Sequence, residues 1–501
     1  MKIRSLLLSA CLVGITGCTT LGPDYAKPAL ATPDSWRVPV DRAAKISNLE
    51  WWKSFGDPVL ENLVQEALAH NQDLRIAAAR LLEYAARVDI ARAGSYPQLG
   101  YGASVSRLQA SRTTLNGVPE GVSRVGDDYL ASLNVGWELD FWGRIARSTE
   151  ASRAELLAAA YGRRSVILSV VSAVATGYLS LRSLDRQLEI ARETLRRRAE
   201  SLALFEERFR GGVVSELEVA QIRSEYQAAA VLIPTIERQI AQTENALSLL
   251  VGRYPGDIVR GKRVGELKLP QVPPDIPSEV LQRRPDILQA EQNLIAANAR
   301  IGVARAAYFP RISLSGMLGL ASADLSRLVK GASGIWNLGA AAGGSIFTGG
   351  EVEARVRLSE AVQQQALHAY IKTVQTAFVE VNDALAISRK DREILDATRR
   401  QVTALRSYAR FARMRYDGGY VSYVEVLDAE RGLFDAELEY TRREADVYAA
   451  LVGVYKALGG GWLAGLEQQL NATDFADEEE KAARGKDRLT SGKTPPVPPA
   501  P

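Results

Sequence analysis

Two long stretches of the chain carry apolar residues at every third or fourth position, the spacing of one face of a helix. The first stretch, 144–210, has no proline, and the second, 351–416, has neither glycine nor proline. At a rise of about 1.5 Å per residue, each stretch predicts a helix on the order of 100 Å long. The spacing is that of a coiled-coil seam, and a soluble coiled-coil rod has the same periodicity. In the first stretch the seam residues are Ile167, Val170, Val171, Val174, Tyr178, Leu181, Leu184, Leu188, Ala191, Leu195, Ala199, Leu202, Phe205 and Phe209.

Between the helical stretches, apolar residues alternate with polar ones, which is the two-residue period of a β-strand. The alternation is clearest in "YLASLNVGWELDF" from Tyr129 and in "RISLSGMLGL" from Arg311. Four strands are predicted, at about 97–107, 128–142, 310–321 and 335–348. Aromatic residues lie at their ends, namely Tyr96, Tyr101, Trp142, Tyr308, Phe309, Trp336 and Phe347.

Strands of about ten residues with one apolar face and aromatic ends are typical of outer-membrane barrels. A soluble antiparallel sheet fits the alternation equally well. Glu138 and Asp140 lie opposite a large apolar stripe, which favours the membrane interpretation together with the N-terminal signal described below. Four strands cannot close a barrel alone, because backbone groups in lipid must be paired and the smallest bacterial barrels have about eight strands. Several copies of the chain are therefore expected to share one barrel.

The order of elements occurs twice along the chain. Residues 73–97 match 286–310 at nine of 25 positions, with an offset of 213. The short segment from Phe209 matches the segment from Tyr416 with an offset of 207, and its paired glycines can turn a helix sharply. We therefore predict two tandem repeats, each built as helix, two strands, long helix, turn and return helix. The predicted bounds are 59–251 and 284–458 for the repeats, 144–210 and 351–416 for the long helices, 211–215 and 417–422 for the turns, and 216–251 and 423–458 for the return helices.

The first residues read as a secretory signal, with Lys2 and Arg4 before an apolar run. Ile15-Thr16-Gly17-Cys18 resembles a bacterial lipobox, so residues 1–17 are expected to be removed and Cys18 to be lipidated. The alternative is an ordinary signal peptide with an accidental cysteine. Removal of 1–17 leaves Cys18 as the only cysteine, which excludes a disulfide within the chain. No other segment has 18 consecutive apolar residues, so no transmembrane helix is expected.

Composition argues against a nucleic-acid-binding protein, because the net charge is only +3 and 24% of residues are charged. The basic run 196–198 is surrounded by acids and is expected to be a solvated helix face. His70 and His368 have no metal-like spacing, and no nucleotide-binding or hydrolase motif occurs. We therefore expect neither an enzyme nor a cofactor or metal site. Few methionines and histidines also disfavour a role in relaying metal.

The sequence resembles the TolC-type outer-membrane efflux factors, in particular their OprM- and NodT-like lipoprotein branch. The markers are "SWRVP" near 35, "WWKSFGDPVLENLVQEALAHNQDL" from Trp51 and "VPPDIPSEVLQRRPDI" from Val272. The resemblance implies a homotrimer with a 12-stranded membrane β-barrel, four strands from each chain, above a periplasmic coiled-coil α-barrel of about 100 Å. It also implies an equatorial belt formed by 18–58, 252–283 and the start of 459–501. From Asp474 the chain is charged and then proline-rich, a composition that predicts a disordered tail.

The resemblance further implies a passive exit duct for drugs and other small amphiphiles. Such a duct works with a periplasmic adaptor and an inner-membrane pump, often of the proton-driven resistance (RND) type, and lies in outer-membrane lipid. Two alternatives stay open. One is a pore-less periplasmic coiled-coil scaffold or adaptor, and the other is the outer channel of a metal-export or type I secretion system.

The family places its constriction just after the second turn, at Val424, Glu425 and Asp428. Glu218 is the first-repeat counterpart of Glu425, and Tyr416 is a candidate for the contact that holds the closed end. The alternative is that the acids merely favour the positive end of a helix dipole. Some relatives carry an arginine in the second turn, which 420–423 lack here. The expected adaptor-contact residues are Gly211, Gly212, Val213, Val214, Ser215, Gly418, Gly419, Tyr420, Val421 and Ser422.

Overall fold

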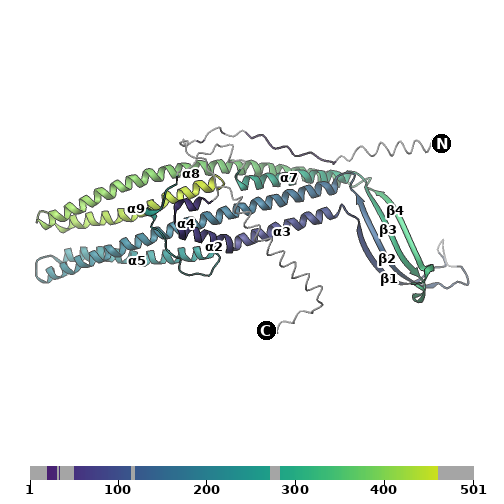
Figure 1. Ribbon diagram of the computed structural model, residues 1–501, viewed down its shortest axis with the longest axis horizontal. Coiled ribbons are helices and arrows are strands. Elements are labelled where there is room, and N and C mark those ends of the chain that lie inside the picture. The colour runs from purple at the N-terminus through teal and green to yellow at the C-terminus, as the bar shows by residue number, and fades with distance from the viewer. Residues whose placement is uncertain are drawn as a thin grey trace. The chain divides into compact units, whose positions relative to one another are not determined.

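The computed structural model describes residues 20–30, 33, 36, 50–113, 119–270 and 283–460. The expected signal peptide, Cys18, most of the segment before Glu50, part of the link between repeats and the C-terminal tail lie outside the described residues. Long helices and one sheet make up the chain (Figure 1). The helices are α2 (Pro58–His70), α3 (Gln72–Ala93), α4 (Arg144–Arg210), α5 (Glu216–Leu250), α7 (Pro285–Arg305), α8 (Glu351–Asp417) and α9 (Tyr423–Ala457). The strands are β1 (Gln98–Gln109), β2 (Val125–Leu139), β3 (Arg311–Ser322) and β4 (Gly334–Gly343).

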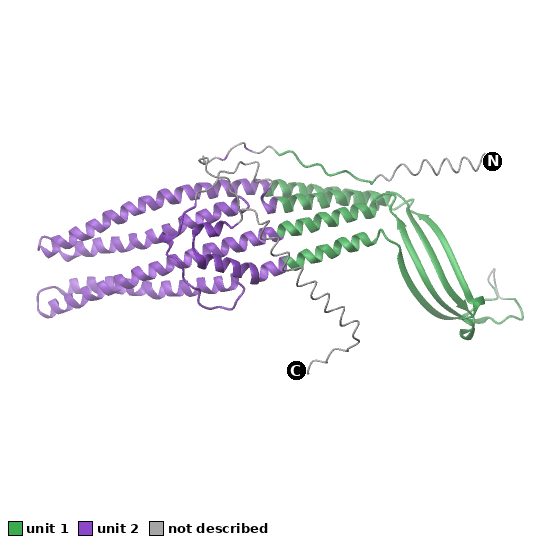
Figure 2. Ribbon diagram, viewed as in Figure 1, with its two compact units in different colours: residues 1–30, 78–162, 288–373 green, residues 31–77, 163–287, 374–501 purple. Residues whose placement is uncertain are grey.

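The chain divides into two compact units (Figure 2). Unit 1 comprises 1–30, 78–162 and 288–373, and unit 2 comprises 31–77, 163–287 and 374–501. Both sequence repeats contribute residues to each unit, so the boundary between the units does not coincide with the boundary between the repeats. The helices α3, α4, α7 and α8 each have residues in both units.

Unit 1 holds a four-stranded antiparallel sheet in the order β1-β2-β3-β4. Its apolar side chains share one face, as the alternation predicts: Leu133 lies opposite Tyr101 on one side and opposite Leu318 on the other. These three side chains are 50%, 90% and 64% exposed, so the apolar face is uncovered in a single chain. Lipid is the solvent that suits such a face.

Two strands end earlier than the alternation predicts. β2 stops at Leu139 because Asp140 turns to cap α4, its carboxylate accepting from the backbone amides of Ile145 and Ala146 at 3.0 and 2.7 Å. β4 stops at Gly343, which pairs with the first residue of β3, Arg311. A proline precedes that residue in the partner strand and has no amide hydrogen to extend the ladder.

The helices of unit 1 meet along a seam of small residues, with Ala151 and Ala154 of α4 packed against Ala296 and Ala299 of α7. Residues 20–27, which we call the N-terminal strap, lie across these two helices. The closest approach is between Gly22 and Gly302, where a methyl group added to either glycine would lie within 2.5 Å of the other backbone or of a strap carbonyl. Only glycine at both positions permits that contact.

Three side chains fasten the strap. Arg147 of α4 donates to the carbonyl oxygen of Leu21 at 3.1 Å and pairs with the carboxylate of Asp24 at 2.7 Å. Asn298 of α7 donates to the carbonyl oxygen of Pro23, and Glu291 pairs with Lys27, both at 2.8 Å. Arg147 and Asn298 are at most 7% exposed and the side chain of Glu291 is 12% exposed, as expected for residues under the strap.

The core of unit 2 explains the second family marker, which begins at Trp51. Trp51, Trp52 and Phe55 are buried to 3% exposure or less, and Gly56 takes a positive φ of 68° that ends their short helical turn. Asp57 follows as the N-cap of α2, with a proline in the first turn of the helix.

The carboxylate of Asp57 is fully buried and accepts three hydrogen bonds. It accepts from the backbone amides of Val59 and Lys262 at 2.9 and 3.0 Å and from the hydroxyl of Tyr178 in α4 at 2.7 Å. Burial raises the pKa of Tyr178, so its hydroxyl stays a donor, and its oxygen accepts from the amide of Gly261 at 2.9 Å. One buried acid thus joins α2, α4 and the link between the repeats.

The expectation that 196–198 is a solvated face is wrong for Arg198. Its side chain is 7% exposed and pairs with Glu225 of α5 at 3.1 Å, with its guanidinium 5.1 Å from the ring centre of Phe434. The guanidinium group can be buried here because the carboxylate of Glu225 and the ring of Phe434 replace the water that would otherwise solvate it.

Among the described residues, one helix, α4, contains an 18-residue window whose mean hydropathy of 1.5 would suit a membrane span by composition and length. The sequence analysis expected no such helix. Of that window, 56% is buried, and Ile167, Val171 and Val174 of α4 belong to the core of unit 2. The apolar content of α4 serves packing within the protein.

Candidate functional site at the hairpin ends

The two long helices end in the same backbone turn. After α4, the amide of Gly212 donates to the carbonyl of Phe209 and the amide of Val213 donates to that of Arg208. Each of these bonds recurs at the equivalent positions of the second repeat, at the end of α8. The second glycine of each turn has a positive φ, 73° at Gly212 and 76° at Gly419, which is the conformation that needs glycine. The repeated sequence therefore encodes a repeated helix end.

The return helices begin differently, although both carry the pattern Ser-x-x-Glu. At α5, Ser215 and Glu218 form a capping box in which each side chain accepts from the other residue's backbone amide, at 3.3 and 2.8 Å. At α9, the side chain of Ser422 makes no cap hydrogen bond. The carboxylate of Glu425 instead pairs with Arg415 of α8 at 3.1 Å, across the turn. Glu218 is thus engaged in helix capping, whereas Glu425 bridges the two helices of its hairpin.

The two hairpin ends pack on each other through a small apolar cluster. Phe205 of α4 lies 4.4 Å from Tyr423 of α9 between ring centres, and Tyr416 of α8 lies 4.9 Å from Tyr423. Arg208 of α4 donates to the hydroxyl of Tyr416 at 2.8 Å. We call this cluster, completed by Val219, Ile222, Ala412, Val426 and Ala429, the tip cluster.

The repeats differ in a buried ion pair near the hairpin ends. The buried pair of Arg198 with Glu225 belongs to the first repeat. The equivalent positions of the second repeat hold Leu405 and Gly432, and a methyl group at Gly432 would be in van der Waals contact with Leu405 at 3.4 Å. An ion pair in one hairpin is therefore replaced by apolar packing in the other.

Asp428 has a local partner. It pairs with Arg431 one turn along α9 at 2.7 Å, and the same guanidinium lies 3.9 Å from Glu225 of α5. Arg431 therefore links the two hairpins by charge as well.

Glu430 of α9 is half-buried, and burial raises its pKa above that of an exposed glutamate. The nearby guanidinium groups of Arg413, Arg198 and Arg197 oppose that rise. Burial also raises the pKa of Tyr423. Burial thus favours the protonated form of the Glu430 carboxyl group.

The expected constriction and contact residues lie at one end of unit 2. Val424 is 47% exposed, Asp428 is exposed, and Tyr416 and Glu425 are half-buried. Eight of the ten expected contact residues are exposed, and Val214 and Val421 are half-buried. Arg208 and the pair of Arg198 with Glu225 were not predicted from the sequence. Comparing the repeats position by position would have pointed to the pair, because both members change type between the repeats.

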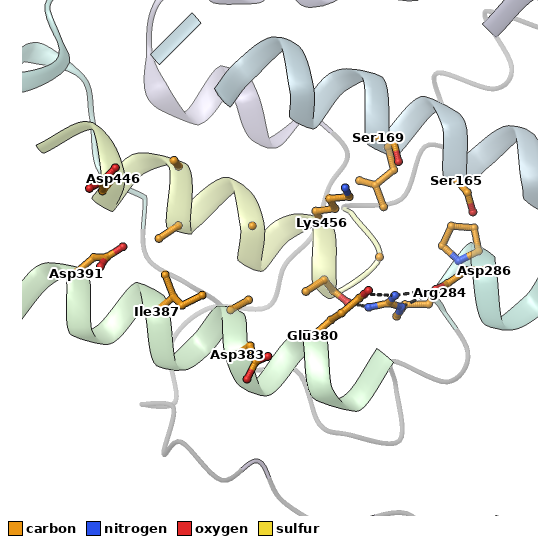
Figure 3. Close-up of a pocket in the computed structure, with 18 residues that line it drawn as sticks. Ser165, Ser169, Arg284, Asp286, Glu380, Asp383, Ile387, Asp391, Asp446 and Lys456 are labelled. Atoms are coloured by element: carbon orange, nitrogen blue, oxygen red, sulfur yellow. Dashed lines mark hydrogen bonds and ion pairs between the residues drawn. The ribbon is translucent and has the colours of Figure 1, made fainter. Parts of the chain in front are cut away.

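A cavity of about 670 Å³ lies elsewhere in unit 2, between α4, α8, α9 and the start of α7 (Figure 3). At its edge Arg284 pairs with Asp286 and Glu380 at 2.7 and 2.5 Å and donates to the carbonyl of Ala457 at 2.8 Å. This arginine, the second of the marker "RRPDI", joins the start of α7, the middle of α8 and the end of α9. Burial raises the pKa of Asp391 on the cavity wall. The contacts of Arg284 give this part of the marker a packing role.

The described part of the chain contains no group of three or more histidine, cysteine or acidic side chains placed to hold a metal ion. What the hairpin ends offer is mechanical and electrostatic. They present an apolar cluster between the two hairpins, polar and charged contacts between helices, and carboxylates near exposed turns.

Comparison with known proteins relates this geometry to a family. A family model described as outer membrane efflux protein matches residues 63–253 and 276–460, one segment in each repeat. The chain is 37% identical over 468 residues to the cation efflux system protein CusC of Escherichia coli O6:H1, covering 91% of this chain and 98% of that protein. It is also 37% identical over 470 residues to the toluene efflux pump outer membrane protein TtgI of Pseudomonas putida, covering 92% and 99%. The crystal structure of the Campylobacter jejuni CmeC outer membrane channel matches with a TM-score of 0.82 at 28% identity, covering 89% of this chain and 95% of that one.

Proposed function

This chain belongs to the outer membrane efflux protein family and is the outer-membrane exit duct of an efflux system, and from that premise we propose that the hairpin ends are its closable periplasmic entrance. The fold class expected from the sequence is confirmed, as are the outer-membrane location and the efflux role. Because the family is a transport component, we infer that the chain has no catalytic role of its own.

The observation that carries the proposed entrance is the crossing of bonds at the hairpin ends. A hydrogen bond from Arg208 to Tyr416 joins the two hairpins. An ion pair between Arg415 and Glu425 joins the two helices of the second hairpin. The apolar contact of Phe205 with Tyr423 lies beside them. Separating the hairpin ends would break the hydrogen bond of Arg208 with Tyr416 and the charge contact of Arg431 with Glu225, and it would expose the tip cluster. A partner that binds the exposed turns can therefore supply the free energy of opening.

The acidic residues at the hairpin ends would favour the passage of cations over anions. With three copies in the assembly, Glu425 and Asp428 would bring six carboxylates to the entrance, and such a ring attracts cations and repels anions. The neighbouring Arg415 and Arg431 neutralise part of this charge in the closed hairpin. The side chain of Val424 is exposed at the start of α9, and it would narrow the opening.

The test is ion selectivity in planar bilayers. Glu425→Ala with Asp428→Ala should reduce the preference for K⁺ over Cl⁻ and lower the conductance at low salt. Glu216→Ala removes an acid from the first turn of α5 and is the matched control, expected to leave selectivity unchanged. If the double variant kept wild-type selectivity and lost only thermal stability, the acids would serve the helix dipole alone.

The ends of the duct should contact other proteins and lipid. We propose that the exposed turns 211–215 and 418–422 dock a periplasmic adaptor, which brings an inner-membrane pump of the RND type. Cys18 is proposed to carry the lipid that anchors the chain in the outer membrane, and the belt is proposed to include 18–58, 252–283 and the start of 459–501. Labelling with radioactive palmitate, lost in Cys18→Ser, tests the lipid anchor.

The cargo proposed for the duct is drugs, solvents and other small amphiphiles, since TtgI is named for toluene efflux. Export of metal cations is the second candidate, because CusC is named a cation efflux protein. A deletion strain separates them by its susceptibility profile. Sensitisation to dyes, detergents and antibiotics supports the first candidate, and sensitisation to metal cations alone supports the second.

A further inference from the structure

The cavity of unit 2 shown in Figure 3 lies on the faces of α4 and α9 opposite the core around Trp51. On α9, Gly453 lines the cavity, whereas Tyr455, two positions further on, stacks on Trp51 with 5.4 Å between ring centres. On α4, Ser169 lines the cavity and Val171 belongs to the core. Two positions correspond to about 200° of rotation around a helix, so the cavity and the core lie on opposite sides.

The core on the other side contains the end of the N-terminal belt segment. Trp51, Trp52 and Phe55 belong to 18–58, which we assign to the belt around the duct. Because the belt surrounds the helices from outside, the opposite face of α4 and α9 lies toward the interior of the duct. The cavity is then a recess in the inner wall.

The cavity wall carries more acidic than basic side chains. Its acids are Asp286, Glu380, Asp383, Asp391 and Asp446, and its bases are Arg284 and Lys456. Arg284 pairs with two of the acids, and Asp446 pairs with Arg443 at 3.2 Å. Within the described part of the chain, Asp383 and Asp391 have no ion pair. Even with Arg443 included, five acids face three bases, so the wall is negative.

Two of the carboxylates share one end of the cavity. Asp391 of α8 and Asp446 of α9 lie there on facing helices (Figure 3). Burial raises the pKa of Asp391, and the charge of Asp446 raises it further, while Arg443 opposes the rise. A cation between the two carboxylates would offset both the loss of water and the repulsion.

The rest of the wall suits the uncharged body of a small molecule. Leu168 of α4 and Ile387 of α8 are apolar, and Ile387, which follows Asp383 by one turn, is 51% exposed. The hydroxyl oxygen of Ser165 is buried and has no hydrogen-bond partner among the described residues. The cavity volume of about 670 Å³ falls within the range of about 300–1,000 Å³ that small-molecule sites occupy.

The packing of the helices does not depend on these acids, because the first repeat builds the corresponding faces without them. With the offset of 207, Glu380, Asp383, Asp391 and Asp446 correspond to Ala173, Thr176, Leu184 and Gln239. Arg284 corresponds to Asn71, whose side chain donates to the carbonyl of Leu250 at 2.8 Å, just as Arg284 donates to the equivalent Ala457. The junction between helices therefore needs a donor, whereas the acids belong to the second repeat alone.

A second cavity, of about 570 Å³, adjoins the first and shares Asp446 and Ala449 with it. Its other charged residues pair with one another, since Glu439 lies 2.7 Å from Arg443 and 3.6 Å from Arg442. With two acids and two bases, the second cavity is balanced. The excess of negative charge is therefore confined to the first cavity.

We propose that the first cavity is a cargo site on the duct wall, which binds an organic cation with an apolar body, and this site rests on the proposed function. The cationic group lies between Asp391 and Asp446, and the apolar body covers Ile387 and Leu168. A metal ion fits the recess less well, because no three acidic, histidine or cysteine side chains among the described residues are placed to hold one. The duct thus has an affinity of its own for one class of cargo.

Binding of ethidium, a planar organic cation, to the purified full-length lipoprotein tests the site. The protein is held in nanodiscs of phosphatidylcholine, and fluorescence anisotropy gives the dissociation constant. Asp383→Asn with Asp391→Asn should weaken binding about ten-fold, because the attraction between opposite charges is strong in a partly buried site. Glu393→Gln with Asp396→Asn removes the same charge from exposed positions of α8 outside the cavity and should leave binding nearly unchanged.

Access to the cavity from the duct is tested without removing an acid. Ser169→Cys places a thiol on the cavity wall, and the thiol of Cys18 is proposed to be blocked by lipid. A cationic methanethiosulfonate reagent should modify this thiol about ten-fold faster than an anionic one and should lower the single-channel conductance. Adding Asp383→Asn and Asp391→Asn should bring the two rates together.

The cargo site is overturned if wild-type protein shows no saturable binding of ethidium, or if the variant without Asp383 and Asp391 binds ethidium as tightly as wild type. Equal rates of the two reagents at Ser169→Cys would also overturn it. Bilayer conductance of the same samples separates this site from the duct. A conducting wild type with any of these results refutes the cargo site alone, and a wild type that does not conduct refutes the proposed duct as well.

Discussion

Replacing Tyr416 with phenylalanine removes one hydroxyl group from the contact between the two hairpins. That hydroxyl accepts from Arg208 at 2.8 Å, and no other change in shape accompanies its loss. Arg208 is half-buried, so water can replace part of the bond, and about 1 kcal/mol per chain is the expected loss. If three chains open together, about 3 kcal/mol shifts the closed-to-open ratio on the order of 100-fold. The cation–π contact of Arg208 with Phe205 stays in place.

The assay is the open probability of single channels of purified Tyr416→Phe protein in planar bilayers. Tyr420→Phe is the matched control, because this tyrosine lies in the same turn region, is 81% exposed, and has no hydrogen bond from its hydroxyl to the described residues. Wild type and Tyr420→Phe should open rarely and Tyr416→Phe often. Equal open probabilities for all three, with equal thermal stability, would show that the Arg208–Tyr416 bond does not hold the entrance closed.

Three further predictions concern the stability of unit 2. Asp57→Ala leaves buried donors without an acceptor and should cost about 3–5 kcal/mol, measured as a lower guanidinium midpoint, whereas Glu61→Ala in the first turn of the same helix should change it little. Ser215→Ala breaks a capping box and should cost about 1 kcal/mol, and Ser422→Ala should cost far less because that serine makes no cap bond; equal costs would contradict the asymmetry. Burial raises the pKa of Glu430 in the folded protein, so its contribution to stability is present at low pH and is lost as the pH rises through the raised pKa. Glu430→Gln should therefore gain stability over wild type at pH 7 and lose that gain on acidification toward pH ~4, and a gain independent of pH would refute this assignment.

Periodicity predicts the long helices because their apolar residues pack on one side over many turns. The expected long helix 351–416 ends within one residue of α8, and the paired glycines mark both turns. The ends of strands are harder to predict from the sequence, because they depend on contacts with the neighbouring strand or helix. Asp140 leaves its strand to cap a helix, and Gly343 ends β4 where its partner strand has a proline.

Long-range contacts between charged and polar groups are where the sequence falls short. No local sequence pattern around Arg198 predicts its contact with Glu225, because the end of α4, the turn and the start of α5 lie between them in the sequence. The seating of the strap depends on Gly22 and Gly302, which belong to distant parts of the sequence. The capping box at Ser215 is different, because its Ser-x-x-Glu pattern is local and readable.

Conductance of the purified, lipidated protein in a planar bilayer tests the central claim most directly. An exit duct should give discrete ion-conducting events with a preference for cations, raised in frequency by Tyr416→Phe. A periplasmic scaffold of long helical hairpins without a pore would give a silent bilayer under every condition, and that result would contradict the account.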